Sequence, residues 1–281
     1  MKRAARALLR SLAPQFLLDK RREYLLLRRL KSELDLRNGG SHEETSITMR
    51  GDHAACDEAE VLFHAMLKTL GSDPGDLGRI LEIEGMSGRK YRQLVNEIIA
   101  STIDPRYLEI GSWAGSTACA AIHGNRLQAT CIDNWSEFGN AKEAFFSNVN
   151  ASLHSGVDFS FIESDFRRVD YRDIGTYNVY LFDGPHRESD HYDGIRMAQP
   201  ALADTHVLIV DDWNWSGVRL GSLRGLADEG LGILFSIEIR TTRDDSLPLS
   251  VEGKATDWHN GYFVAVCRKR GVTSADLRPQ P

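Results

Sequence analysis

Short apolar runs alternate with longer amphipathic stretches over most of the chain after residue 106. Seven runs stand out in order: YLEI, ATCID, FSFIE, NVYLF, HVLIV, ILFSIEIR and YFVAVC. Alternation of strand-length runs with helical segments is typical of a parallel sheet with helices on both faces. The pattern therefore predicts an α/β fold with a Rossmann-like sheet of seven mostly parallel strands. Only a polar loop, Thr241 to Gly261, precedes the last run, so we expect the last strand to run antiparallel.

The first third of the chain has a helical period instead. Apolar residues recur at helical spacing up to about Leu36, with a break at Pro14, and again in helices that start near Asp57 and Ser87. The polar, glycine-containing stretch over residues 38–52 is typical of a linker. We expect two parts: an N-terminal helical arm or cap over residues 1–84 and an α/β domain over residues 85–281.

Charge is unevenly divided along the 281 residues. The net charge is −6, but residues 1–34 alone carry +7, so the remainder carries −13. A compact acidic body argues against nucleic acid as the main partner. Two interpretations of the basic N-terminal helix stay open. It contacts a membrane surface or a partner, or it packs on its own domain or on a second subunit of a homo-oligomer.

Composition places the chain among ordinary globular proteins, with 42% hydrophobic and 26% charged residues. Its four cysteines show no CxxC pair and no zinc-like spacing. Free, buried thiols are typical of a reducing compartment, and we expect a cytoplasmic location. No apolar run reaches the ~18 residues that a membrane-spanning helix needs, so we expect no such helix.

Two glycines follow the first apolar run, in the stretch YLEIGSWAGST. Gly111 and Gly115 lie where a strand turns into a helix, and Ser116 and Thr117 begin that helix. A tight turn needs glycine for its geometry, and a ligand needs glycine where the backbone must come close. The spacing of these glycines differs from the dinucleotide motif GxGxxG.

Acidic residues end the next two runs. Asp133 closes ATCID, about 20 residues after the glycine turn, where a carboxylate can accept both hydroxyls of a ribose. Asp165 follows FSFIE, where it can meet a base. Either acid can also cap the helix that follows it. Acids at successive strand ends favour a nucleoside site, because the carboxyl ends of parallel strands meet at one edge of the sheet.

From about Gly85 onward the chain resembles a class I S-adenosylmethionine-dependent methyltransferase. The segments that carry the resemblance come in order and at the usual intervals: YLEIGSWAGST, CIDNW, IESDF, YLFDGPH and VLIVDDWNW. The glycine spacing departs from the commonest GxGxG form. It is similar to that of catechol-type O-methyltransferases and of bacterial enzymes that methylate sugars.

The resemblance implies S-adenosylmethionine as the cofactor of the domain over residues 85–281. In this family the glycine turn approaches the methionine part of the cofactor, and the acid after the second strand holds the ribose. The segment EGMSG is similar to the one that borders the methionine end. The cofactor-binding residues implied are Glu109, Gly111, Trp113, Gly115, Thr117, Asp133, Asp165, Met86 and Ser87.

The fourth and fifth runs also end in acids. Asp183 follows NVYLF, and Asp211 and Asp212 follow HVLIV. Ends of neighbouring strands lie ~4.8 Å apart, so the three carboxylates can converge on one hard cation. A single acid at such a place can instead cap a helix. In the catechol-type enzymes two acids and an amide bind magnesium. Here an acid takes the third place, and Asn214 is a candidate supporting group.

His186 follows Asp183 at the offset where catechol-type enzymes carry a lysine that acts as a base. Histidine suits this role because its unperturbed pKa lies near neutral pH. We expect His186 and Asp183 to be catalytic, with His191 as the rival histidine. The loop from Thr241 to Gly261 is long enough to act as a lid, and its His259 is a candidate for the acceptor site.

The sequence therefore predicts transfer of a methyl group from S-adenosylmethionine to a hydroxyl oxygen of a small molecule or sugar. A divalent cation, which we expect to be magnesium, assists the reaction. A vicinal diol can chelate one cation, which favours a sugar or catechol-like acceptor. Two other classes stay open. One is an NAD-dependent oxidoreductase, which shares the sheet and the ribose acid. The other is a non-catalytic cofactor-binding module.

Overall fold

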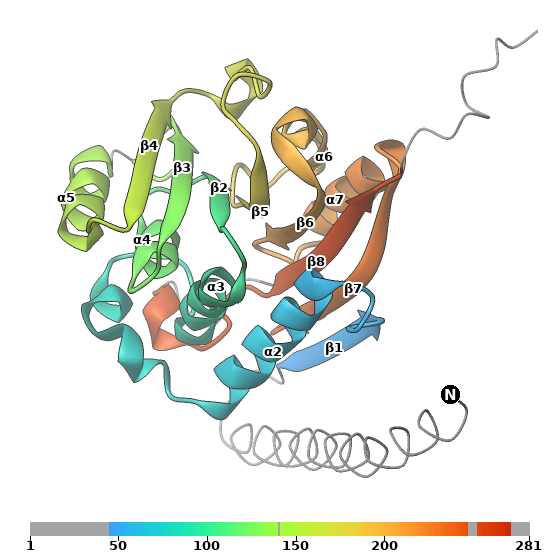
Figure 1. Cartoon of the computed structure of the whole chain (residues 1–281), viewed down its shortest axis with the longest axis horizontal. Helices are drawn as coiled ribbons and strands as arrows, with labels where there is room; N and C mark the ends of the chain where they lie inside the picture. The colour runs from blue at the N-terminus through green and yellow to red at the C-terminus, as the bar shows by residue number, and fades with distance from the viewer. Residues whose placement is uncertain (1–44, 140, 247–251, 271–281) are drawn as a thin grey trace, which may run out of the picture. The chain divides into compact units, whose positions relative to one another are not determined.

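A computed structural model describes residues 45–139, 141–246 and 252–270. The basic helix expected before residue 37 lies outside the described residues. All described residues belong to one compact unit, and an eight-stranded sheet runs through it (Figure 1).

The strand order of this sheet is β1-β7-β8-β6-β5-β2-β3-β4. The strands are β1 (Ser46–Gly51), β2 (Arg106–Ile110), β3 (Leu127–Asp133), β4 (Val157–Glu163), β5 (Tyr177–Phe182), β6 (Leu202–Val210), β7 (Leu231–Arg240) and β8 (Tyr262–Lys269). Pairing is parallel from β4 through β6, and β8 runs antiparallel to both of its neighbours, β6 and β7. The Rossmann-like α/β fold and the antiparallel last strand are confirmed.

Helices cover both faces of the sheet. They are α2 (Asp57–Gly71), α3 (Arg89–Ser101), α4 (Ser116–Ile122), α5 (Lys142–Ser152), α6 (Glu188–Met197) and α7 (Ser216–Asp228). Short 3-10 turns lie in the connections between elements: η1 (Pro74–Glu82), η2 (Phe166–Arg168), η3 (Gln199–Ala201) and η4 (Gly253–Ala255). Contacts run from α2 through α3 to α4, and separately between α6 and α7, and Figure 1 shows these two groups on opposite sides of the sheet.

The strand count was predicted one too low. We expected residues 38–52 to be a linker, but Ser46–Gly51 pairs antiparallel with β7 and forms the edge of the sheet. This strand is polar and only partly buried, so it has no apolar run that could mark it. Residues 45–84 thus contribute β1, α2 and η1 to the same unit as the sheet. A separate capping role for residues 1–84 stays a proposal.

Continuous apolar runs form the centre of the sheet because parallel strands are covered on both faces. The core cluster includes Leu108, Tyr180, Phe182 and Leu208, all at most 1% exposed. The order in which strands are added to the sheet reverses between β2 and β5. Strands β3 and β4 lie on one side of β2, and β5 lies on the other side. Crevices at such a switch point are where open α/β sheets bind ligands.

Two expectations drawn from composition can be compared with the described residues. No helix among them is long and apolar enough to cross a membrane. All four cysteines are free, and Cys119, Cys131 and Cys267 are buried.

Candidate active site

A pocket of about 320 Å³ opens beyond the carboxyl ends of the strands, at the switch point. Gly111 and Asp133 line one part of it, after β2 and β3, and Asp183 and Asp212 line another part, after β5 and β6. The glycine turn, the nucleoside-side acid and the acid cluster predicted from sequence therefore meet in one cavity.

The glycine turn is dictated first by packing. Gly111 has φ +88°, and a Cβ at this position would lie 1.8 Å from the carbonyl oxygen of Asp183 on the neighbouring strand. Gly115, with φ +86°, is the N-cap of α4. Neither position tolerates a side chain without strain, so the turn has a structural reason for its glycines. Gly111 and Trp113 line the pocket, whereas Gly115 does not.

Asp133 fixes the turn to the end of β3. Its Oδ2 accepts a hydrogen bond from the backbone N–H of Trp113 at 2.7 Å, and its Oδ1 accepts one from the N–H of Trp135 at 2.7 Å. A carboxylate oxygen has two acceptor sites, so each oxygen retains capacity for a ligand hydroxyl. The carboxylate lines the pocket and is partly exposed.

Glu109 and Thr117 lie behind the turn rather than in the pocket wall. Glu109 is fully buried and accepts hydrogen bonds from the hydroxyls of Tyr107 and Thr117. Burial raises the pKa of Glu109 to about 7, although these hydrogen bonds oppose the shift. Both residues join β2 to α4 and hold the glycine turn from below, so they support the pocket without lining it.

The segment EGMSG reaches the pocket through one residue. Met86 lines it, whereas Ser87 is buried and shares a hydrogen bond of 2.9 Å with the hydroxyl of Ser116. The guanidinium of Arg92 holds this segment, since it donates to Ser87 Oγ at 2.9 Å and to the carbonyl of Ile83 at 2.8 Å. Burial lowers the pKa of Arg92 to about 10. No pattern in the sequence predicted that Arg92 would be buried beside this segment.

Asp165 lines the pocket but also has a local structural task. Its Oδ1 accepts the N–H of Arg167 at 2.9 Å, so it is the N-cap of η2. Arg167 also lines the pocket, and its guanidinium binds Asp190 at 2.6 Å and Asp193 at 2.9 Å. Asp165 therefore caps the turn that follows it and also lines the cavity.

The acid cluster gathers at the ends of β5 and β6. Asp183, His186 and Asp212 each offer one ligand atom, and these three atoms lie within 4.8 Å of one another. His186 Nε2 lies 2.8 Å from Asp212 Oδ2. Asp211 also lines the pocket, but its Oδ1 accepts the backbone N–H of Asp212 at 2.6 Å. Of the predicted ligands, Asp183 and Asp212 thus group with His186, while Asp211 shapes the turn.

The pKa values of the three acids in this cluster shift in different directions. Burial and the charge of Asp212 raise the pKa of Asp183 well above its usual range, and burial and the charge of Asp183 do the same for Asp211. Burial opposes the charged form of Asp212, but its hydrogen bond to His186 prevails and lowers its pKa. For His186, burial is outweighed by Asp212 and Asp183, which raise the pKa to about 9. The positive charge of His186 therefore stabilises the carboxylate of Asp212.

The rival histidine takes no part in the pocket wall. His191 is fully buried on α6, where its ring contacts Phe182, and burial lowers its pKa to about 3. His186 instead lies between two aromatic rings, with centroid distances of 5.9 Å to Phe138 and 5.1 Å to Trp215. The structure therefore separates the two histidines by surroundings: one is a neutral core residue, and one faces the acids.

Sequence reasoning missed Asn260, which lines the pocket just before β8. Its Nδ2 donates to Asp212 Oδ1 at 2.6 Å. His259, which we expected near the acceptor site, also lines the pocket. No apolar pattern marks this part of the loop, so only the antiparallel pairing of β8 beside β6 brings it to the acids.

Strained backbone concentrates around the pocket. Seven non-glycine residues among those described have positive φ, and four of them line this cavity: Trp113, Phe138, Asp212 and His259. Each such conformation costs on the order of 1 kcal/mol, and observed strain of this kind clusters at functional sites. The distribution supports a binding or catalytic role for the pocket.

Comparison with known proteins agrees with this geometry. Residues 108–213, from β2 to the turn after β6, match a family model described as a methyltransferase domain. The match supports a methyltransferase domain in this part of the chain. No curated protein matches the sequence.

Solved structures with a similar fold are distant. TrmN from Thermus thermophilus has a TM-score of 0.47 and 14% identity, over 68% of this chain and 52% of that one. A putative methyltransferase from Streptococcus mutans has a TM-score of 0.45 and 14% identity, over 64% and 48%. A putative RNA methyltransferase from Pyrococcus horikoshii has a TM-score of 0.45 and 12% identity, over 76% and 98%. The chain spans about half the length of the first two.

Proposed function

We propose that this protein transfers the methyl group of S-adenosylmethionine to a hydroxyl oxygen of a small molecule or sugar, with a divalent cation. One observation carries the proposal. A single pocket joins Asp133, which suits a ribose, to the cluster of Asp183, His186 and Asp212, which suits a cation and a proton. A methyl donor and a metal-held hydroxyl need this arrangement, because the two reactants must meet in line.

The cofactor residues divide by task. Asp133 accepts the ribose hydroxyls, and the backbone of Gly111 and Trp113 borders the ligand, with Met86 at one end and Asp165 at another. The remaining predicted residues, Glu109, Gly115, Thr117 and Ser87, position the turn and the segment beside it. An acid at the ribose position discourages a 2′-phosphate.

The acid cluster fits a hard divalent cation. Asp183 and Asp212 are the carboxylates best placed to hold it, with Asp211 as a further carboxylate at the same edge. Oxygen-rich sets of this kind suit magnesium. The cation, when bound, supplies positive charge that lowers the pKa of a coordinated hydroxyl.

Proton transfer falls to His186. Asp212 and Asp183 raise the pKa of His186 to about 9, and a cation held by these carboxylates would offset their charge and lower that pKa. Asp212 holds Nε2, so Nδ1 is then the nitrogen left to take a proton from the acceptor. The rings of Phe138 and Trp215 flank this histidine and offer an apolar wall to the acceptor's carbon skeleton. A vicinal diol on a sugar or an aromatic ring suits such a site, because it presents two oxygens to one cation.

Calorimetry with S-adenosylhomocysteine and with NAD tests the cofactor assignment. We expect binding of S-adenosylhomocysteine alone. Binding of NAD alone would instead favour the oxidoreductase. That class of enzyme does not explain the cluster of Asp183, Asp211 and Asp212. Radiolabelled S-adenosylmethionine with a panel of sugars and catechols then tests catalysis. The label should move to an acceptor with magnesium and remain on the donor in excess chelator, and an unchanged rate in chelator would remove the cation from the reaction.

The setting of the reaction stays a proposal. The free thiols are consistent with the cytoplasmic location that the sequence predicts. A small-molecule acceptor rather than nucleic acid is expected from the acidic body of the chain. The predicted membrane, partner or homo-oligomer contact of the N-terminal helix lies outside the described residues.

A further inference from the structure

Both oxygens of the Asp212 carboxylate are engaged. Oδ2 lies 2.8 Å from His186 Nε2, and Oδ1 accepts the amide of Asn260 at 2.6 Å. The residue is 8% exposed and has φ +57°, so the carboxylate lies in a largely buried site. The direction in which this carboxylate faces depends on the group that holds Oδ1.

The amide of Asn260 is oriented in turn by a second amide. Its Oδ1 accepts from Nδ2 of Asn214 at 3.1 Å, and the same Nδ2 donates to the hydroxyl of Thr241 at 2.7 Å. The Oδ1 of Asn214 accepts the backbone N–H of Thr241 at 3.0 Å. Asn214 is 0% exposed and Asn260 is 1% exposed. These contacts form one continuous series that runs from Thr241 through Asn214, Asn260 and Asp212 to His186.

The backbone N–H of Thr241 fixes the donor-to-acceptor direction of this series of hydrogen bonds. The N–H of Thr241 can only donate, so the side chain of Asn214 must present its oxygen there and its NH₂ to Asn260. Asn260 then presents its oxygen to Asn214 and its NH₂ to Asp212. Reversing either amide would place two acceptors or two donors face to face in a buried site, at a cost of about 1–3 kcal/mol.

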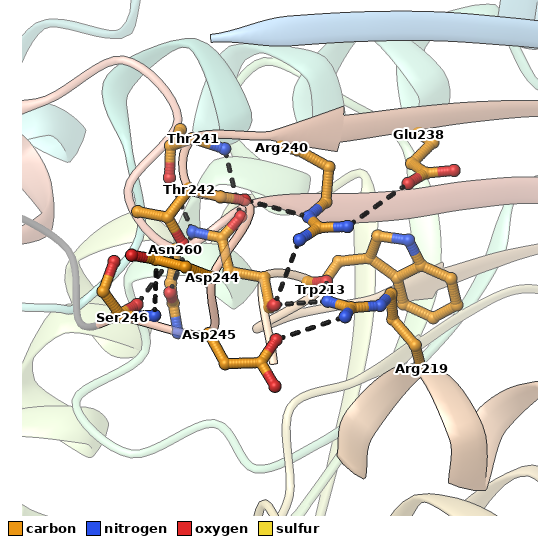
Figure 2. A network of polar contacts seen from close by, with 11 residues as sticks. Trp213, Arg219, Glu238, Arg240, Thr241, Thr242, Asp244, Asp245, Ser246 and Asn260 are labelled. Atoms are coloured by element: carbon orange, nitrogen blue, oxygen red, sulfur yellow. Dashed lines mark hydrogen bonds and ion pairs between the residues drawn. The ribbon is translucent and has the colours of Figure 1, made fainter. Parts of the chain in front are cut away.

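The surroundings of Asn214 are built to keep it in place. A Cβ on Gly261 would lie 2.6 Å from Asn214 Oδ1, so only glycine fits beside the amide. Arg219 and Arg240 both donate to the backbone carbonyl of Asn214. These arginines form ion pairs with Asp245 and Glu238, and Figure 2 shows both pairs, with Arg219 on α7 and Arg240 at the end of β7.

We propose that Asn214 and Asn260 are positioning residues, which hold the Asp212 carboxylate so that Oδ2 stays bonded to His186 Nε2. The inference rests on the proposed function for its purpose: it keeps Nδ1 of His186 turned to the acceptor. Asn214 does not line the pocket. It acts on His186 only through Asn260 and Asp212.

Nuclear magnetic resonance of the histidine ring N–H groups tests this relay without any acceptor. The Nε2–H signal of His186, identified by its loss in His186→Gln, is recorded at fixed pH in excess chelator. Asn260→Ala and Asn214→Ala should shift this signal upfield or broaden it, because Asp212 loses its fixed direction. Asn214→Asp should do the same, since its carboxylate has no proton to donate to Asn260.

Asn96→Asp is the matched control. The amide of Asn96 on α3 donates to the carbonyls of Ala120 and His123 and does not line the pocket, so this variant loses two partly buried hydrogen bonds elsewhere. It should lower the melting temperature and leave the His186 signal unchanged. The relay is overturned if folded Asn214→Ala and Asn260→Ala keep the wild-type signal, or if Asn96→Asp moves it as much. S-adenosylhomocysteine binding, measured in parallel, reports on the proposed function separately.

Discussion

Replacing Asp183 with asparagine should show whether the acid cluster is built around a cation. Ligand atoms of Asp183 and Asp212 lie within 4.8 Å of each other. Two like charges at that separation repel by ~3 kcal/mol when the effective dielectric constant is about 20. The neighbouring His186 and partial protonation reduce this repulsion. We therefore expect Asp183→Asn to stabilise the chelator-treated protein by about 1–2 kcal/mol, or about 2–8 °C in melting temperature.

Magnesium should reverse this order. A cation at 100 times its dissociation constant stabilises the wild type by about 2.7 kcal/mol, because it binds the folded state alone. Asp183→Asn keeps little of that gain, since it lacks one of the carboxylates that hold the cation. Scanning calorimetry of both proteins, in chelator and in a magnesium series, measures the two effects together.

Asp165→Asn is the control for this experiment. Asp165 lines the same pocket but caps η2, and an asparagine oxygen can still accept the N–H of Arg167. It should retain the wild-type response to magnesium. The cation site is refuted if Asp183→Asn is no more stable than the wild type in chelator, or if magnesium raises both melting temperatures equally.

Three other substitutions probe the turn and its supports. Gly111→Ala should prevent stable folding, because its Cβ would lie 1.8 Å from the Asp183 carbonyl. Circular dichroism should show a smaller loss, about 1–2 kcal/mol, for Gly124→Ala, which has the same left-handed strain at φ +70° but open space for the Cβ. Burial favours the protonated form of Glu109, so the wild type should lose about 3 kcal/mol of stability as pH rises from the ordinary carboxyl pKa of 4.5 through about 7. Glu109→Gln should not show this loss in urea unfolding. Parallel pH curves of the two proteins would contradict this. Asp133→Ala should weaken S-adenosylhomocysteine binding about 10- to 100-fold in calorimetry, and an unchanged affinity would exclude the ribose contact.

The central strands and the acids after them were predictable from sequence for one physical reason. Strands β3, β5 and β6 are largely buried, so they appear as apolar runs, and a carboxylate at the end of such a run must lie at the edge of the sheet. Asp133, Asp183 and Asp212 were found in this way, and all three line the pocket. Local sequence was sufficient because strand direction alone brings these ends together.

The rest depended on contacts that no local pattern records. Strand β1 is a polar edge strand, so its pairing with β7 left no periodic signal. Glu109 was assigned to the cofactor set from its place beside the glycines, yet its side chain bonds Tyr107 and Thr117, because successive strand residues point to opposite faces. Asn260 reaches Asp212 across 48 residues of sequence, through the antiparallel return of β8.

The helix-cap alternative, which sequence left open for every strand-end acid, separates these residues into two groups. Asp165 does cap the turn that follows it. On the other side, α6 has Arg187 as its N-cap, and α7 has Trp215 with no side-chain cap bond, so Asp183 and Asp212 cap neither helix. Asp212 also bears positive φ, and Asp183 has its pKa raised by burial and by a neighbouring acid. A buried carboxylate that caps no helix and whose pKa is raised beside a second carboxylate, as at Asp183, favours a binding or catalytic role.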